Sequence, residues 1–486
     1  MNNKAEILLI NPAGKHIVGD RTPPYGLLSL AAALPRETPL RLLDLRFEKH
    51  SAVESALRSP ELRLVGISCL TGKQVGQTAE LTRLVHARTK APVVWGGIFP
   101  TQMTEMSLRQ GGADGVVRGE GEVVFRALAA LPSLPAAAEP AGFARLTTSG
   151  ELSGEKSLGV RLDLAELPDP RFDLVDVRRY IEHGPYGPAF SLLTSRGCPC
   201  ECAYCYMKSI YDRHWRGHTA EWVVELVRRL HRDYGIRHFQ FMDDNFMTSL
   251  ERVREIARRL IEARLDLTWA VFGATVVSLN NLGLEGLRLL RRAGCRIVNI
   301  GTESGSEIIL QMIHKNVDLP TLLKVNGWMK EAGLKPSYNF MSGFPGETDA
   351  DVRASVDLML RLKNENPAAD CGTIKLFLPY PGTELYEVVR RDYGFQPPAE
   401  LSFWSRYSWS EADGLDMPWL EPRRKKRLLL LYYLSILMNP RYLFIRSRFF
   451  RAAAFVLYPL TRYRFRRMRV DTALLPRLLH WIYKKL

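Results

Sequence analysis

Residues 194–205 read Thr-Ser-Arg-Gly-Cys-Pro-Cys-Glu-Cys-Ala-Tyr-Cys and directly follow a short apolar run that predicts a β-strand. The C-x-x-x-C-x-x-C spacing of Cys198, Cys202 and Cys205 lets one loop direct three thiolates at a single metal centre. Three protein ligands on a four-iron cube leave the fourth iron open to a small molecule, as the open position of a catalytic zinc does. The stretch therefore predicts a metal site on these cysteines, with a [4Fe-4S] cluster as the leading interpretation.

A structural zinc site is the alternative interpretation of the same loop. Cys200 or His214 would supply the fourth ligand, but the sequence has no second C-x-x-C or His pair at zinc spacing. Cys200 is therefore expected to be a bystander. Four of the seven cysteines crowd into residues 198–205, which is typical of a metal site in a reducing compartment and not of a disulfide framework.

Outward from this loop, residues 186–395 alternate apolar strands with amphipathic helices about six times. The predicted strands are 190–194, 238–242, 267–272, 297–300, 336–341 and 373–378. This alternation is typical of a partial (β/α)6 barrel, a fold that places its chemistry at the C-terminal ends of the strands. The cysteine loop and several polar turns follow predicted strands, so we expect them at that edge.

Residues 1–135 show the same alternation with shorter strands. The predicted strands are 7–10, 40–45, 64–68, 92–95 and 115–117. Repeated βα units imply an α/β domain with a doubly wound, Rossmann-like sheet that binds a ligand at its strand ends. No G-x-G-x-x-G follows the first strand, which disfavours a dinucleotide. Residues 136–185 are rich in Ala, Pro, Ser and Gly and predict a linker.

The cysteine motif and the later turns resemble the radical S-adenosylmethionine (SAM) superfamily. Tyr204 matches the aromatic position that packs on the adenine in that family, and residues 343–348 resemble its G-x-P-G-E-T turn. The resemblance covers residues 186–395 and implies that the open iron binds SAM, which one electron cleaves to a 5′-deoxyadenosyl radical. It implies SAM contacts from Tyr204, Asp243, Asp244, Asn245, Glu303, Ser304, Gly343, Pro345 and Leu378.

Residues 1–135 resemble the cobalamin-binding domain that precedes the radical SAM domain in one large subgroup. The shared motifs are Pro-Pro-x-Gly-Leu at 23–27, Gly-Gly-x-x-Pro-Thr at 96–101 and Gly-Glu-Gly-Glu at 119–122. The resemblance implies a cobalamin site on Thr71, Gly72, Gln74, Gly96, Gly97, Phe99, Pro100, Thr101, Gly119, Glu120, Gly121 and Glu122. The Asp of the family's Asp-x-His-x-x-Gly motif is Gly14 here, so His16 is not expected to ligate cobalt.

Together the two resemblances imply an enzyme with a [4Fe-4S] cluster, SAM and cobalamin as cofactors. The leading hypothesis is methylation of an unactivated carbon through the 5′-deoxyadenosyl radical and methylcobalamin. Cyclisation or rearrangement of a tetrapyrrole or natural product stays open, as does a non-catalytic cobalamin carrier or regulator. The expected electron donor is a flavodoxin or ferredoxin, and no general acid or base is assigned.

The net charge of +15 is concentrated in residues 421–486, which contain seventeen Lys and Arg and two acids. Residues 396–486 are predicted to be a separate, aromatic-rich helical segment. Its short apolar runs beside basic and aromatic residues suit helices that lie on a membrane surface, which predicts contact through residues 423–486. The alternative is that residues 428–438 form a buried helix on the barrel.

The membrane interpretation favours a lipid or another hydrophobic substrate. RNA is disfavoured, because Cys69 is the single cysteine of the N-terminal domain, whereas the related methylthiotransferases carry further cluster cysteines there. The N-terminal apolar run is too short for a signal peptide, and no stretch reaches the roughly 20 apolar residues that span a bilayer. We therefore expect a cytoplasmic protein, peripheral on the inner face of the membrane.

Overall fold

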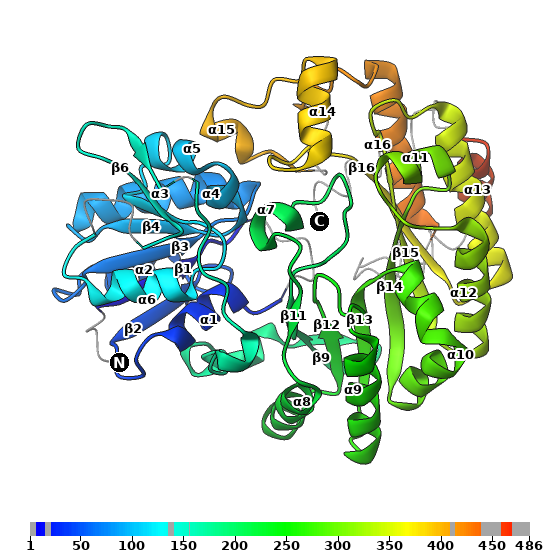
Figure 1. The fold of residues 1–486 in the computed structure, drawn as a ribbon, viewed down its shortest axis with the longest axis horizontal. Helices are drawn as coiled ribbons and strands as arrows, with labels where there is room; N and C mark the ends of the chain where they lie inside the picture. The colour runs from blue at the N-terminus through cyan, green and yellow to red at the C-terminus, as the bar shows by residue number, and fades with distance from the viewer. Residues whose placement is uncertain are drawn as a thin grey trace. The chain divides into compact units, whose positions relative to one another are not determined.

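The computed structural model describes residues 6–14, 21–134, 140–154, 156–408, 414–438 and 458–468. The chain forms two compact units, each made of separate stretches of sequence (Figure 1). Unit 1 comprises Met1–Glu182, Tyr206–His218 and Gln396–Ser408. Unit 2 comprises His183–Cys205, Thr219–Phe395 and Trp409–Leu486.

Unit 1 is built on a seven-stranded sheet in the order β2-β1-β3-β4-β5-β6-β7. Its parallel strands are β1 (Ile7–Asn11), β2 (Leu40–Asp44), β3 (Leu64–Ser68), β4 (Val93–Gly96) and β5 (Gly115–Val117). The helices are α1 (Tyr25–Ala33), α2 (His50–Ala56), α3 (Lys73–Arg88), α4 (Ile98–Gln102), α5 (Thr104–Arg109) and α6 (Glu122–Ala130). The central strands β1 and β3 are buried on both faces, which explains their continuous apolar runs. The doubly wound α/β prediction is confirmed.

Residues 136–185 do not behave as the expected linker where the structure describes them. β6 (Phe143–Leu146) pairs antiparallel with β5, and β7 (Leu152–Ser153) pairs antiparallel with β6. Phe143 is fully buried in the core of unit 1. Three short 3-10 helices follow: η1 (Leu164–Glu166), η2 (Phe172–Leu174) and η3 (Val177–Tyr180). The short apolar stretches that make these contacts are separated by Pro, Gly and Ser, so composition alone concealed them.

The predicted separate segment 396–486 is also divided differently. Its first part belongs to unit 1, where α15 (Leu401–Trp404) packs on α3. Trp404 is fully buried, and its ring centroid lies 5.8 Å from that of Phe99. A large aromatic side chain that is buried in this way fixes the segment to unit 1.

Unit 2 contains a seven-stranded sheet in the order β16-β15-β14-β13-β12-β9-β8. The six parallel strands are β9 (Gly187–Leu192), β12 (His238–Phe241), β13 (Thr268–Ala274), β14 (Cys295–Glu303), β15 (Lys335–Ser342) and β16 (Asp370–Leu376), and β8 (Glu182–Gly184) lies at one edge. The helices are α8 (Ala220–Tyr234), α9 (Leu250–Glu262), α10 (Val276–Arg292), α11 (Glu307–Met312), α12 (Leu319–Glu331), α13 (Asp349–Glu365) and α14 (Glu384–Tyr393). The curled sheet with its helices confirms the predicted partial barrel.

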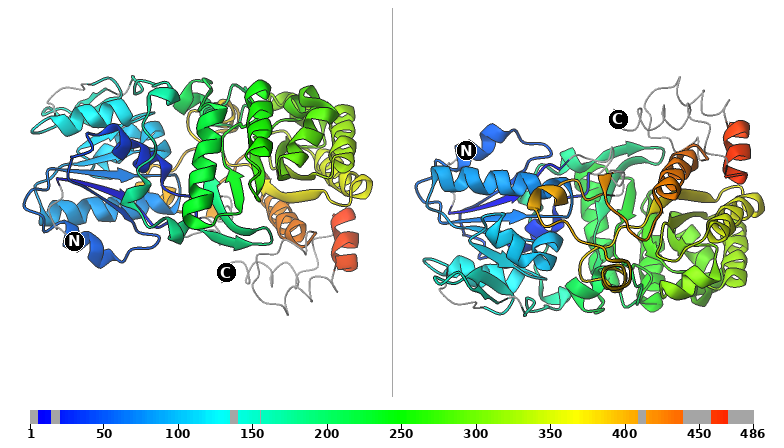
Figure 2. Two further views of the ribbon diagram at one scale, coloured as in Figure 1. Left: turned by 90° about the horizontal axis from the view of Figure 1, so that it is seen from below. Right: turned by 90° about the horizontal axis from the view of Figure 1, so that it is seen from above.

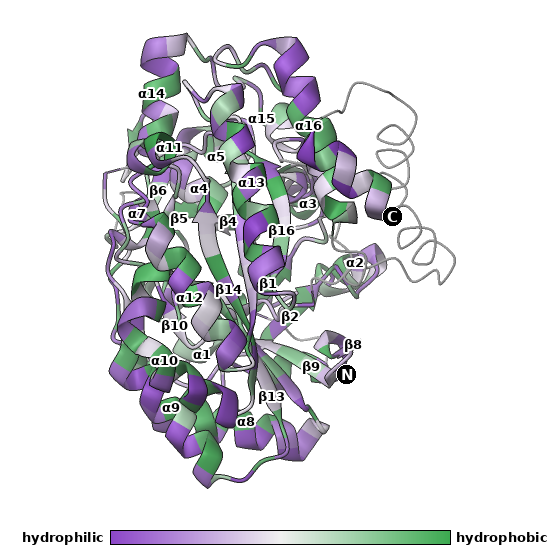
Figure 3. Cartoon of the chain, turned by 90° about the vertical axis from the view of Figure 1, so that its right-hand side faces the viewer, coloured by the Kyte–Doolittle hydropathy of each residue, from purple (hydrophilic) through white to green (hydrophobic). Residues whose placement is uncertain are grey.

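The helices α8 to α14 begin at Ser, Thr or Asp residues that cap a free backbone N–H group. The capping residues of α8 to α14 are Thr219, Ser249, Thr275, Ser306, Asp318, Thr348 and Thr383. Hydrophobic and hydrophilic residues alternate along α9 and α10, as in helices that bury one face (Figure 3). The caps fix where each strand-to-helix turn ends, which positions the polar turns at the C-terminal edge of the sheet.

The helix α16 (Pro422–Leu437) packs on β16 (Figure 2). Leu428, Leu431 and Leu434 are buried, and Ser435 Oγ accepts a hydrogen bond from Ile374 N at 3.1 Å. Most apolar side chains of residues 428–438 are therefore covered by unit 2, which does not support membrane contact through α16. The alternative of a buried helix is confirmed.

The rest of the basic segment is described in part. Residues 458–466 are helical, whereas 439–457 and 469–486 lie outside the described residues. In the part of the chain that the structure describes, every helix is too short or too polar to cross a bilayer.

Candidate functional site

The cysteine loop starts at the C-terminal end of β9 and is anchored at its centre. Ala203 N donates a hydrogen bond to Ile313 O, and Ala203 O accepts one from Leu385 N, both at 3.0 Å. Cys205 N donates to Cys202 O at 3.0 Å, which closes a turn between two of the predicted ligands. Cys202 and Cys205 are partly exposed, as is Cys198, whereas Cys200 is exposed.

The side chains of Asn245 and Lys315 place hydrogen-bond donors near sulfurs of this loop. Asn245 Nδ2 lies 3.5 Å from Cys198 Sγ, and Lys315 Nζ lies 4.0 Å from Cys202 Sγ. A hydrogen bond from the Cys200 thiol lowers the pKa of Cys198, and the same bond raises the pKa of Cys200. This bond favours the thiolate at Cys198 and the thiol at Cys200, whereas burial raises the pKa of Cys202.

The donor set fits an iron–sulfur cluster by its chemistry. In the described ranges, no three His, Cys, Asp or Glu side chains are gathered closely enough to hold a metal ion as they stand. The three cysteines nevertheless share one anchored loop, with amide and ammonium donors aimed at sulfur, the environment that tunes clusters in proteins. His214, considered as a zinc ligand, lies 2.9 Å from Arg161 Nη1 in unit 1.

Tyr204, Glu303 and Lys315 form a polar group beside the loop, in which Glu303 is buried and the other two are partly exposed. Burial and the neighbouring Glu303 carboxylate, to which the hydroxyl is hydrogen-bonded, raise the pKa of Tyr204 well above its usual value. Lys315 Nζ lies 3.5 Å from Glu303 Oε1, and the two side chains are 11% and 9% exposed. A Cβ atom at Gly301 would lie 2.6 Å from Glu303 Oε1, so glycine makes room for the pair. Lys315 was not predicted, because it follows α11 and belongs to no strand-end motif.

Asp243 and Asp244 follow β12; Asp243 is buried, whereas Asp244 is exposed. Asp243 Oδ1 accepts from Thr194 N and its Oδ2 from Ser195 Oγ, each at 2.6 Å. Asp244 Oδ2 accepts from Gly197 N at 2.9 Å. These predicted SAM residues tie β12 to the cysteine loop, while the neighbouring Asn245 side chain reaches the sulfurs.

The other predicted SAM residues lie at the C-terminal ends of β14, β15 and β16. Gly343 has a φ of +83°, and Pro345 and Leu378 are buried. The Tyr204 and Phe344 ring centroids lie 6.2 Å apart, so the turn after β15 borders the cysteine loop. Ser304 is fully buried and its Oγ lies 3.2 Å from Ser355 Oγ of α13, so its hydroxyl faces the interior.

The three glycine-rich loops of unit 1 meet at the C-terminal edge of its sheet. Phe99 N donates to Cys69 O at 3.2 Å, which joins the loops after β3 and β4. Gly119 N donates to Thr101 Oγ1 at 3.0 Å, which joins the loops after β4 and β5. Thr71 and Gly72 precede α3, whereas Gly121 and Glu122 lie at the start of α6. The predicted cobalamin residues are therefore contiguous, as in a doubly wound sheet with one ligand site.

Most polar side chains of these loops bind the protein itself. Gln74 accepts from Leu70 N at 2.9 Å and donates to Pro12 O at 3.1 Å, and Phe99 and Pro100 are buried. Gly96 and Gly97 keep partly exposed backbone. Gly97 has a φ of +108°, and an added Cβ would lie 2.8 Å from Cys69 O. This surface fits a bulky cofactor held by shape and backbone groups. His16 lies outside the described residues.

Residues 206–218, which directly follow Cys205, pack within unit 1. Arg216 forms an ion pair with Glu120, whose side chain is 4% exposed, and Arg216 Nη1 donates to Leu162 O at 2.5 Å. Gln102 Nε2 donates to Ser209 Oγ of α7 (Met207–Tyr211) at 3.2 Å. The predicted cobalamin residue Glu120 is therefore bonded to Arg216, a partner about 100 residues away that no local pattern could indicate.

Two family models match the chain in the order of these sites. The B12 binding domain matches residues 16–129, and the Radical SAM superfamily matches residues 192–359. An uncharacterized methyltransferase of Pyrococcus horikoshii is 30% identical over 392 residues, which cover 79% of this chain and 82% of the relative.

Other relatives carry more specific names. An anaerobic magnesium-protoporphyrin IX monomethyl ester cyclase of Synechocystis is 27% identical over 73% of this chain and 72% of the relative. The hopanoid C-3 methylase of Methylococcus capsulatus is 26% identical over 77% of this chain and 71% of the relative.

Among solved structures, the cobalamin-dependent SAM radical enzyme OxsB, with aqua-cobalamin and SAM bound, has the same fold. Its TM-score is 0.73 at 14% identity, over 99% of this chain and 75% of that chain. The two matched domains, their order and the 30% identical relative lead to one conclusion: this chain belongs to the cobalamin-dependent radical SAM enzymes.

Proposed function

We propose that the chain is a C-methyltransferase that acts on an unactivated carbon of a hydrophobic substrate. In this proposal Cys198, Cys202 and Cys205 hold a [4Fe-4S] cluster. The observation that supports it best is the anchored cysteine loop at the C-terminal edge of six parallel strands, with Asn245 and Lys315 directed at the sulfurs. When bound, the cluster and SAM supply a radical that abstracts hydrogen, and cobalamin supplies the methyl group.

The chain's own residues bind and orient these groups. Asn245 and Lys315 donate toward the ligand sulfurs and stabilise the thiolates. Tyr204 and Glu303 form a polar wall beside them, while the buried Leu378 adds apolar surface. Buried side chains of this kind exclude water, which protects a reactive radical.

A hydrophobic substrate is supported by a relative and by a surface of this chain. The hopanoid C-3 methylase named above acts on a lipid by its name. In the helix 458–466, Leu460 and Tyr463 are 48% and 50% exposed, and Arg467 lies 6.0 Å from the centre of the Tyr463 ring. An exposed apolar and basic face suits an anionic lipid surface. We therefore retain membrane contact for this helix and not for α16.

Cyclisation of a tetrapyrrole is the second candidate function. It is supported by the 27% identical cyclase from Synechocystis, which matches a similar share of the chain. The residues described above serve either outcome, because both begin with hydrogen abstraction. The products of SAM distinguish the two functions.

The test uses anaerobically reconstituted full-length protein with cobalamin, reductant, lipid extract and SAM labelled in its methyl group. Methyl transfer predicts 5′-deoxyadenosine, S-adenosylhomocysteine and labelled lipid. Deoxyadenosine without homocysteine would exclude methyl transfer and favour rearrangement. Absence of both nucleosides, with cluster and cobalamin bound, would contradict either activity on these lipids.

A further inference from the structure

The turn after β15 has a shape that glycine makes possible and that its neighbours maintain. Gly343 and Gly346 have φ values of +83° and +75°, a region that L-residues with side chains rarely adopt. Thr348 and Asp351 form a capping box that starts α13 immediately after the turn. Residues 343–347 are therefore held between a strand end and a fixed helix start. They are also the turn whose pattern resembles the adenine-side turn of SAM enzymes.

Glu347 is a buried carboxylate folded back onto this turn. Its side chain is fully buried, and its Oε2 accepts hydrogen bonds from Gly343 N at 2.6 Å and Ser342 Oγ at 2.7 Å. Its Oε1 has no hydrogen-bond partner among the described residues. A buried carboxylate is stable as an anion when a cation lies close to it.

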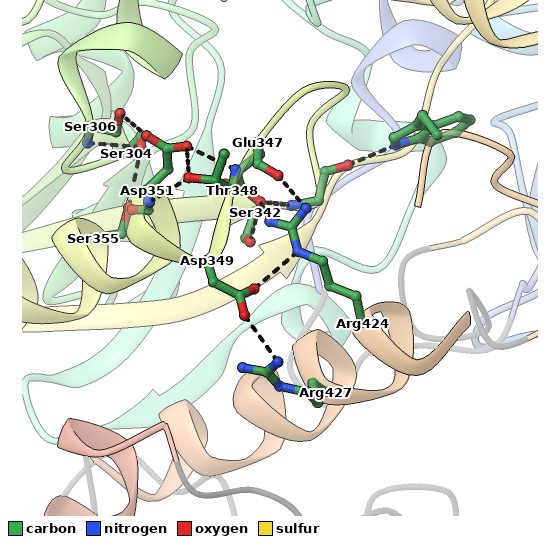
Figure 4. A network of polar contacts seen from close by, with 12 residues as sticks. Ser304, Ser306, Ser342, Glu347, Thr348, Asp349, Asp351, Ser355, Arg424 and Arg427 are labelled. Atoms are coloured by element: carbon green, nitrogen blue, oxygen red, sulfur yellow. Dashed lines mark hydrogen bonds and ion pairs between the residues drawn. The ribbon is translucent and has the colours of Figure 1, made fainter. Parts of the chain in front are cut away.

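Arg424 of α16 supplies that cation (Figure 4). Its Nη2 lies 3.6 Å from Glu347 Oε2, and its guanidinium also donates to Glu347 O. Its Nε lies 3.2 Å from Asp349 Oδ1, so the guanidinium bridges the turn and the first residue of α13. The Arg424 side chain is 19% exposed, which limits screening by water.

A second contact from the same segment reaches the same turn. Trp419 Nε1 donates to Gly343 O at 2.9 Å, and the Trp419 ring centroid lies 6.0 Å from that of Phe377. The helix that carries Arg424 is itself immobilised on β16 by buried leucines and by Ser435. Both ends of the 343–347 turn are therefore tied to a segment that is distant in sequence.

From this arrangement we propose that α16 positions the SAM-binding turn, with Arg424 as the positioning residue acting through Glu347. The inference rests on the proposed function in one respect, namely that residues 343–347 face SAM. Arg424 itself does not touch SAM. Removing it leaves Glu347 without its cation, so the buried carboxylate must take up a proton or be hydrated by a rearranged turn, and either change disturbs the preorganised turn.

Arg427 offers a matched control on the same helix. Its Nη1 lies 3.0 Å from Asp349 Oδ2, and no contact with Glu347 or Gly343 is described for it. Arg424→Met and Arg427→Met thus remove the same charge, one helical turn apart, but only the first reaches the turn. The comparison separates positioning of the turn from general attachment of α16.

The first experiment measures the SAM dissociation constant of anaerobically reconstituted full-length protein, together with the EPR spectrum of the reduced cluster before and after SAM is added. We expect Arg424→Met to raise the Kd for SAM about tenfold or more, equivalent to ~1.4 kcal/mol, and to weaken the spectral change. Arg427→Met should stay within about twofold, and cobalamin binding should not change in either variant. Equal effects of the two variants would overturn the inference. If the unchanged protein with its cluster does not bind SAM, the proposed function fails instead.

A second experiment tests whether Arg424 acts through Glu347. In Glu347→Gln the buried group is neutral, and its amide oxygen can still accept from Gly343 N. Arg424→Met in that background should therefore change the Kd for SAM by less than about twofold. This double variant leaves no buried charge unpaired. It can therefore still be measured if Arg424→Met alone does not fold. A loss of SAM affinity equal to that of Arg424→Met would contradict the inference.

Discussion

The two candidate sites of this chain are built in different ways. At the strand ends of unit 1, side chains such as Gln74, Thr101 and Glu120 bind the protein, and the loops expose glycine backbone. At the strand ends of unit 2, Asn245 and Lys315 point at the cysteine sulfurs. A large cofactor can be held by shape and backbone, whereas a small cluster needs specific ligands and donors. Substitutions that add side-chain volume should therefore weaken cobalamin binding at the first site. At the second site, substitutions that remove a ligand or a hydrogen-bond donor should have the larger effect.

Removing a cluster ligand would separate the two sites most sharply. Cys198→Ala should eliminate the iron–sulfur absorbance and lower turnover below about a thousandth of that of the parent, because the cluster loses a ligand. Cobalamin binding to unit 1 should persist. Cys200→Ala is the matched control and should keep iron content and turnover within about twofold. Iron analysis and ultraviolet–visible spectra check both, and a cluster lost from the Cys200 variant would contradict the ligand assignment.

At the unit 1 site, a substitution that adds side-chain volume should have the corresponding effect and weaken cobalamin binding. Gly97→Val places a branched side chain at a φ of +108°, where a Cβ meets Cys69 O at 2.8 Å. The strain alone costs ~1–2 kcal/mol, so cobalamin affinity should fall about tenfold or more. Spectroscopic titration with cobalamin measures this. Gly26→Ala in α1, where an added Cβ has no atom within 4 Å, should bind normally. Unchanged affinity of Gly97→Val would place cobalamin elsewhere.

Lys315→Met tests whether a charged side chain close to the cysteine sulfurs influences the cluster. Removing a cation 4.0 Å from Cys202 Sγ disfavours the reduced cluster, so the reduction potential should become more negative by roughly 60 mV, a tenfold change for one electron. A redox titration followed by EPR is the measurement. Lys324→Met, at an exposed position over the Trp328 ring, should leave the potential unchanged. An identical potential in both variants would show that Lys315 does not influence the cluster.

Glu347 predicts a smaller, pH-dependent effect. Burial raises the pKa of Glu347 to about 7, with Gly343 N, Ser342 Oγ and Arg424 opposing the rise and Asp351 adding to it. Because the folded pKa exceeds the unfolded one, this group contributes stability below about pH 4.5 that is lost as the pH rises through 7. Glu347→Gln lacks this loss, so its Tm relative to the parent should increase by about 2–4 °C between pH 5 and pH 8. A Tm difference between Glu347→Gln and the parent that does not change with pH would contradict this prediction.

The smallest effect is expected at the surface helix 458–466. Leu460→Asp combined with Tyr463→Asp should lower co-sedimentation with anionic vesicles about threefold, since two apolar contacts are replaced by charges that anionic lipid repels. Cluster content and cobalamin affinity should not change. Equal sedimentation of the parent with neutral and anionic vesicles would contradict an electrostatic membrane contact.

The sequence predicted the local features of both units and missed the distant ones. Strand ends and helix caps follow from residues a few positions apart, so the parallel strands and the polar turns were placed correctly. The partners of Glu120, Glu303 and Glu347 are Arg216, Lys315 and Arg424, which no local periodicity connects to them. The environment of α16 could not be predicted for a related reason. In sequence, an apolar run flanked by arginines is the same whether lipid or protein covers it, and in the structure β16 covers α16.

The division of unit 1 into three stretches of chain has a consequence for its synthesis. Trp404, which packs against Phe99 of α4, emerges from the ribosome some 300 residues after that helix. Until then the Gly96–Thr101 loop lacks that cover, and closing so long a loop is slow and entropically costly. We therefore expect nascent chains to acquire a stable cobalamin pocket only after residue 408 is made, when much of unit 2 already exists. A fragment that ends near residue 185 should accordingly bind cobalamin weakly, even though it contains every predicted cobalamin residue.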